Sequence, residues 1–130
     1  MSLIKSKLGY IATRKRVEEV DPNSSVELEL FNKPFAFKKL YMPITDSYSL
    51  QKYGENVSRM LRMFVDLSWI GRVHVGDRAY LIDENNKYCD LNNLIYMDDQ
   101  YCNFANYKVV SVEIQNLKIK IEFEKIYNND

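Results

Sequence analysis

The strongest constraint on the fold is an alternating pattern near the C-terminus. Every second position from 117 to 123 is apolar, and Lys or Glu fills the positions between them. Successive side chains of a β-strand point to opposite faces of the sheet, so this pattern predicts a strand with one face in the core. Val110, Val112 and Ile114 form a similar alternation upstream, and Gln115-Asn116 supplies a two-residue connection. The sequence therefore predicts a C-terminal β-hairpin.

Shorter apolar runs upstream predict further strands. The alternation V-E-L-E-L over residues 26–30 indicates a half-buried strand. Residues 35–42 form a second run, rich in aromatics, and a proline follows it at a point where proline ends a strand. Two more strands, over 69–75 and 78–83, are expected to form a hairpin around Gly76-Asp77, because glycine supplies the positive φ of a tight turn.

A short helix is predicted between these strands, from residue 47 to residue 53. Asp46 is a favourable N-cap residue and Gly54 a favourable residue for ending a helix. Two interpretations of the next segment remain: residues 57–66 form a strand, or the helix continues through them. The longer helix would place five apolar residues on one face: Leu50, Tyr53, Val57, Leu61 and Phe64. The capping residues and the usual length of strands favour the strand.

Together these elements predict a mainly β fold, either a small β-barrel or a curved antiparallel sheet of six to seven strands with one short helix. A chain of 130 residues fits one domain. We expect residues 26–126 to form this single β domain, with a long loop at 84–106 where no periodicity is visible. Residues 1–25 are expected to be a basic N-terminal arm, because the first sixteen residues include five Lys and Arg and no acidic residue.

The balance of charge argues against nucleic-acid binding as the main function. Eighteen Lys and Arg match eighteen Asp and Glu, whereas proteins that bind nucleic acid through its phosphates usually carry a basic excess. No run approaches the ~20 apolar residues that cross a bilayer. The first ten residues also lack the apolar centre of a signal peptide. We therefore expect no membrane contact and no export by such a signal.

Few residues offer catalytic or metal-binding chemistry. His74 is the only histidine, and its position between two valines is typical of a structural histidine. Cys89 and Cys102 lack the partner spacing of a zinc site. The acidic residues at 90, 98 and 99 lack the alternating oxygen ligands and the final glutamate of a calcium-binding loop. The sequence predicts a protein that is not an enzyme and uses no cofactor or metal.

The order of the elements resembles the head-closure, or stopper, family of head-tail joining proteins in long-tailed bacteriophages. The segment AFKKLYMPITDSYSLQKYG is similar to the family's strand that ends in a short helix, and YKVVSVEIQNLKIKIEFEK is similar to its last strands. The segment MLRMFVDLSWIGRVHVGDRAYLID is similar to the family's most recognisable part, a strand followed by a hairpin. The matching hairpin positions are Val73, Val75, Gly76, Asp77, Tyr80 and Ile82.

This resemblance implies a structural virion protein of the phage neck, assembled in the host bacterial cytoplasm. Copies would form a homo-oligomeric ring that joins the DNA-filled head to the tail and helps to retain DNA until ejection. The implied partners are a portal or adaptor protein on the head side, a tail-completion or tail-tube protein on the tail side, and packaged DNA in transient, non-specific contact. One alternative is a tail-completion or head-tail adaptor subunit of the same neck. Others are a small β-barrel nucleic-acid-binding module and an enzyme that uses the cysteines or His74.

Two groups of residues are candidates for contacts in such a ring. The first belongs to the acidic, tyrosine-rich segment 84–106, which is expected either to line the channel or contact a neighbouring subunit, or to fold onto its own domain. Its candidate residues are Glu84, Asp90, Tyr96, Asp98, Asp99, Tyr101 and Phe104. The second group comprises basic residues expected to contact partners. Three belong to the basic N-terminal run, which a partner can bind, and the other two are arginines, a residue type enriched at interfaces. These are Arg14, Lys15, Arg16, Arg59 and Arg62.

Overall fold

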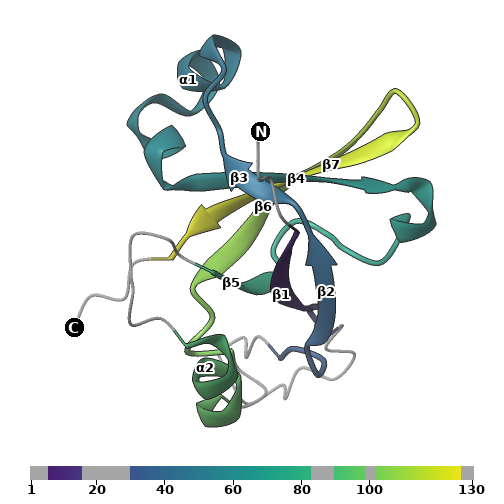
Figure 1. Cartoon of the computed structure of the whole chain (residues 1–130), viewed down its shortest axis with the longest axis vertical. Coiled ribbons are helices and arrows are strands. Elements are labelled where there is room, and N and C mark those ends of the chain that lie inside the picture. Colours follow the sequence, from purple (N-terminus) through teal and green to yellow (C-terminus); the bar gives the residue numbers. More distant parts are fainter. Residues whose placement is uncertain (1–5, 16–29, 83–89, 99–101, 127–130) are drawn as a thin grey trace, which may run out of the picture.

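The computed structural model describes residues 6–15, 30–82, 90–98 and 102–126. Within these ranges, seven antiparallel strands form one unclosed sheet in the order β2-β1-β5-β6-β7-β4-β3 (Figure 1). The strands are β1 (Lys7–Ala12), β2 (Phe35–Lys39), β3 (Tyr41–Pro43), β4 (Met60–Asp66), β5 (Arg78–Leu81), β6 (Tyr107–Gln115) and β7 (Lys118–Lys125). The helical segments are α1 (Ser47–Tyr53), η1 (Gly54–Arg59), η2 (Leu67–Trp69) and α2 (Leu91–Met97), where η denotes a 3-10 helix. The predicted mainly β fold is confirmed, as a curved sheet and not as a closed barrel.

The sheet curls until its two edges approach each other. Its edge strands, β2 and β3, are separated in the chain by Leu40 alone. The hydroxyl of Tyr41, the first residue of β3, donates a 2.7 Å hydrogen bond to the carbonyl of Leu8 in β1. The same hydroxyl accepts a 2.9 Å bond from the backbone N–H of Ile82, just after β5. One buried tyrosine thus connects one edge of the sheet to strands near the other edge.

The main core lies inside this curl and is rich in aromatic residues. The rings of Phe37 and Trp69 meet edge to face with centroids 5.8 Å apart, and Phe37 meets Tyr41 in the same way at 6.3 Å, as aromatic pairs prefer. The buried cluster comprises Ile11, Phe37, Tyr41, Met63, Val65, Trp69, Val73, Ala79, Leu81, Tyr107, Val109, Ile119, Ile121 and Phe123. The alternating apolar residues 119, 121 and 123 of β7 therefore face the core as predicted.

Gly9 in β1 allows the core to pack closely. A Cβ atom at this position would lie 2.4 Å from Cζ of Phe37 and 3.0 Å from Cδ2 of Leu81. We expect Gly9→Ala to lower the free energy of unfolding by about 1–3 kcal/mol, the usual cost of overpacking. Urea unfolding measures this effect. Ala36→Val on the exposed face of neighbouring β2 is the control, and equal losses in both variants would contradict the close approach.

The predicted C-terminal hairpin is confirmed, with its turn one residue later than expected. Asn116 and Leu117 form the turn, with φ of +49° and +66°, so Gln115 is still part of β6. A register shift between Val109 and Ser111 marks a β-bulge. The bulge places Val109 opposite Phe123 on the core side, whereas the sequence pattern had assigned Val110 to that face.

The helix predicted between the strands is confirmed as α1, with its expected cap. The Asp46 carboxylate accepts a 2.9 Å hydrogen bond from the backbone N–H of Ser49 and a 2.8 Å bond from its hydroxyl. These bonds, together with one from Arg62, stabilise the charged form and lower the pKa of Asp46. Gly54 has a φ of +61° and ends the helix. The predicted strand follows at Met60 and not at residue 57, and the alternative of one long helix is wrong.

The predicted hairpin over residues 69–83 is wrong, because residues 70–76 form turns and not a strand. The backbone N–H groups of this segment find partners locally. Ile70 donates to the carbonyl of Leu67 and Arg72 to that of Trp69. The carboxylate of buried Asp77 accepts a 2.8 Å bond from the His74 N–H. Only the part from 78 to 81 forms a strand, β5.

Residues 7–12 form β1, an interior strand between β2 and β5. The prediction of an N-terminal arm over residues 1–25 missed this strand. An isolated bridge between Arg14 and Phe31 extends the pairing of β1 beyond the strand itself. Most of the strand predicted over residues 26–30 lies outside the described residues, and Leu30 is not in a strand.

The expected long loop at 84–106 contains a helix, α2, which the sequence analysis missed. Asp90 caps it by accepting hydrogen bonds from the N–H groups of Asn92 and Asn93. A second buried cluster holds this region against β1 and β5: Ala12, Phe31, Tyr80, Leu91, Cys102 and Ala105. None of the helices in the described ranges is long and apolar enough to span a membrane.

Candidate interaction surface

An apolar groove lies between the turns at 70–76 and the β6–β7 hairpin. We call it the hairpin groove; its volume is about 340 Å³. Its lining residues are Trp69, Ile70, Gly71, Val73, His74, Val75, Val112, Ile114, Ile119 and Ile121. The floor consists of buried core residues, whereas the rim is exposed. Solvent therefore reaches an apolar surface that continues directly into the core.

The rim of the hairpin groove carries large exposed aliphatic side chains. The exposed fractions are 59% for Ile70, 62% for Val75 and 64% for Ile114. Leu117, in the turn of the same hairpin, is 80% exposed. Isolated exposed apolar residues are ordinary, but a concave group of them is typical of a binding surface.

Two glycines and two buried side chains position the rim at 70–76. Gly71 and Gly76 have φ of +80° and +100° and permit the turns. Trp69 and Val73 insert into the core and leave the residues between them outside. The guanidinium of Arg72 lies 4.5 Å from the ring centre of Phe35 and 4.9 Å from that of Trp69, a cation–π arrangement that adds a positive charge beside the groove.

Lys120 and Glu122 on the opposite face of β7 are buried as well, although the Lys and Glu residues of this strand were expected to face water. Glu122 is 1% exposed, and its carboxylate accepts a 2.8 Å bond from Nη2 of Arg62 in β4. The Tyr53 hydroxyl donates to the same carboxylate at 2.9 Å. Burial and this bond raise the pKa of Tyr53. Lys120 pairs with Glu113 at 3.0 Å. The polar groups around Glu122, which no alternation pattern reveals, lie beneath α1.

The basic residues predicted to contact partners differ in their surroundings. The side chain of Arg62 is engaged with Asp46 and Glu122 inside the molecule. Arg59 donates to the side-chain oxygen of Asn56. Arg14 and Lys15 are exposed beside the bridge to Phe31, and the Arg14 backbone N–H donates to Asp77 at 2.9 Å. The prediction for Arg16 lies outside the described residues.

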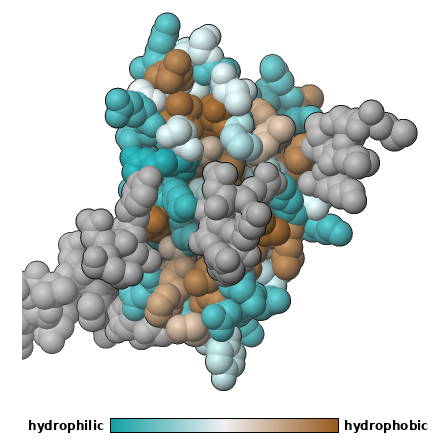
Figure 2. Space-filling model, turned by 60° about the vertical axis from the view of Figure 1, so that its left-hand side comes forward, coloured by the Kyte–Doolittle hydropathy of each residue, from teal (hydrophilic) through white to brown (hydrophobic). Residues whose placement is uncertain are grey.

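The acidic, tyrosine-rich candidates lie in and around α2. The described residues of this segment pack against β1 and β5 of the same chain. The Asp98 carboxylate accepts hydrogen bonds from the Tyr80 hydroxyl and, at 2.9 Å, from the Phe104 N–H. Burial is the main cause that raises the pKa of Tyr80, followed by its bond to Asp98. Tyr96 and Phe104 are exposed. Figure 2 shows apolar side chains reaching the surface at this end of the molecule and at the end with α1. The predictions for Glu84, Asp99 and Tyr101 lie outside the described residues.

The residues considered for catalysis do not converge. His74 is exposed beside the groove, whereas the Cys102 thiol is buried in the cluster around α2. Cys89 lies outside the described residues. In the described ranges, no group of three or more His, Cys, Asp or Glu side chains is arranged to hold a metal ion.

Sequence reasoning missed the hairpin groove because it assigned residues 69–75 to a regular strand. The available signal was the pair of glycines, at 71 and 76, that flank apolar residues without strict alternation. In comparisons with known proteins, no family model matches this chain, and no curated protein or solved structure is significantly similar to it.

Proposed function

We propose that this protein is a structural subunit that functions by binding other protein chains, specifically in the neck of a tailed bacteriophage. There, copies of it form a ring that joins the DNA-filled head to the tail and helps to retain DNA. The resemblance of three sequence segments to the head-closure family supplies the neck assignment. The hairpin groove is the observation that supports binding to other chains.

The hairpin groove supports this proposal because its apolar side chains are exposed to solvent. Ile70, Val75 and Ile114 are exposed on a chain whose formal net charge is zero. Such a surface lowers solubility, which is tolerable when a partner covers it. A partner that fills the groove would remove water from these side chains and from the core residues beneath them.

The proposal is tested in the virus that encodes the chain. Without the protein, we expect DNA-filled heads and tails that remain separate, and we expect the wild-type chain supplied in trans to join them. Ile114→Glu places a carboxylate in the hairpin groove, so it should not restore joining. Leu50→Glu, on exposed α1, is the matched control. Complete infectious particles formed without the chain would refute the neck assignment.

The isolated protein is expected to be a monomer or a weak oligomer that forms a ring only on a docking partner. The sequence has no heptad repeat of apolar residues and no long apolar strand that would force the free chain to self-associate. Sedimentation velocity at micromolar concentration measures the state directly. A stable high-order ring of the free protein would contradict this prediction.

A further inference from the structure

We infer that α1 and η1 form a strap, residues 47–59, that opens away from the sheet as a unit while the sheet stays folded. The strap is held closed mainly by a polar anchor centred on Glu122. This inference rests on the packing of the strap and is independent of the proposed function.

The strap contributes almost nothing to the apolar core. Of residues 47–59, only Ser49 is buried, and it is polar. The larger apolar residues of α1 point outward instead: Tyr48 is 70% exposed and Leu50 is 55% exposed. Regions with few buried apolar contacts open at lower free energy than the core around them.

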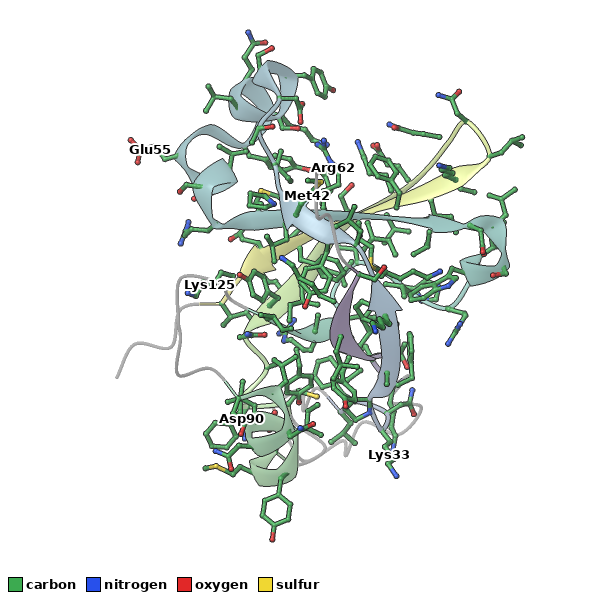
Figure 3. The ribbon with its side chains drawn as sticks, in the orientation of Figure 1. Lys33, Met42, Glu55, Arg62, Asp90 and Lys125 are labelled. Atoms are coloured by element: carbon green, nitrogen blue, oxygen red, sulfur yellow. The ribbon has the colours of Figure 1, made fainter. Side chains whose placement is uncertain are left out.

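Hydrogen bonds and ion pairs take the place of apolar packing. Arg62 of β4 binds Glu122 of β7 through Nη2 at 2.8 Å and Nε at 3.2 Å. The same guanidinium donates to the Ser49 hydroxyl in the strap at 2.7 Å and to Asp46, the residue that caps the strap, at 2.8 Å. The Tyr53 hydroxyl donates to Glu122 from the other end of α1. Figure 3 shows Arg62 between α1 and the sheet.

Both ends of the strap are fixed to the sheet by buried apolar residues. Ile44 is buried between β3 and the Asp46 cap, and Met60 is buried at the start of β4. Opening between these two points leaves β3 and β4 in their places. It also brings water to the charges of Arg62 and Glu122, which are shielded from water while the strap is closed. The structure therefore has a defined closed state, fixed hinges and polar contacts that water can replace.

Native-state hydrogen exchange on the full chain tests the inference. We expect the amides of the strap to exchange faster than those of β6 and β7. Their exchange should also respond little to low urea, because opening exposes little apolar surface. Tyr53→Phe removes one hydrogen bond to a charged group, so exchange in the strap should rise by about tenfold while β6 and β7 keep their protection.

Tyr48→Phe is the matched control, because Tyr48 lies on the same helix with its side chain exposed, and it should leave exchange unchanged. Arg62→Met should raise exchange in the strap more than Tyr53→Phe does, and it should also weaken the sheet, because it leaves the buried Glu122 carboxylate without its ion-pair partner. The inference is overturned if strap and sheet amides share one urea-dependent exchange rate. It is also overturned if Tyr53→Phe accelerates exchange equally throughout the chain, or if Tyr53→Phe and Tyr48→Phe have the same effect.

Discussion

Replacing Phe123 with alanine is expected to lower the free energy of unfolding by about 3–5 kcal/mol. Phe123 is fully buried in β7, with Leu61 of β4 and Val109 of β6 as its register partners. The truncation removes an aromatic ring from the middle of the sheet and leaves a cavity that the neighbouring strands cannot fill. Urea unfolding followed by circular dichroism measures the loss.

Leu117→Ala is the control for Phe123→Ala, because the alternating pattern assigns both residues to the same face. Leu117 lies in the turn and is 80% exposed, so we expect its replacement to cost no more than about 0.5 kcal/mol. Losses of similar size in the two variants would mean that the hairpin does not pack as described.

Asp77→Ala is expected to cost about 3 kcal/mol or more, since each hydrogen bond to a charged group contributes about 1.5–3 kcal/mol. The carboxylate is 1% exposed and accepts the N–H groups of Arg14 and His74. Its loss leaves both donors without this acceptor and frees the turns that form one rim of the hairpin groove. Thermal unfolding measures the stability, and hydrogen exchange of residues 70–76 measures the local effect.

Asp66→Ala is the matched control for Asp77→Ala. Asp66 also accepts a backbone N–H, from Ser68 at 3.0 Å, but it lies on the surface at the start of η2. We expect this loss to be about 1 kcal/mol, the usual cost of removing a cap. Asp77→Asn, which keeps an acceptor oxygen, should fall between the two alanine variants. A loss at Asp77 no larger than that at Asp66 would refute its anchoring role.

The parts of the fold that the sequence predicted are those in which a local pattern determines the structure. The alternation in β7 requires a strand with one apolar face, and Asp46 with Gly54 marks both ends of α1. On the other face of β7 the local pattern does not determine burial. There, Lys120 and Glu122 look like solvent-facing residues but are covered, because Arg62 and Tyr53 come from distant parts of the chain to pair with Glu122.

The segments that were predicted wrongly depend on long-range contacts. Residues 69–75 have the composition of a strand, yet the Asp77 carboxylate and local turns bind their N–H groups. In β1, Gly9 and Tyr10 interrupt any apolar alternation. For this reason an interior strand of the sheet was predicted to be part of a basic N-terminal arm. The hairpin groove depends on both segments being placed correctly, which is why sequence patterns alone missed it.

The strand order also determines when the protein can fold as it is synthesised. β1 leaves the ribosome first and can pair with β2, but its second partner, β5, ends only at Leu81. β3 follows β2 after one residue and pairs with β4. The other neighbour of β4 is β7, the last of the seven described strands to be made. Until β7 emerges, the nascent chain carries unpaired strand edges and an uncovered aromatic face, which are features that favour association with other chains. Strands β1 and β7 must therefore be present together before the core can close.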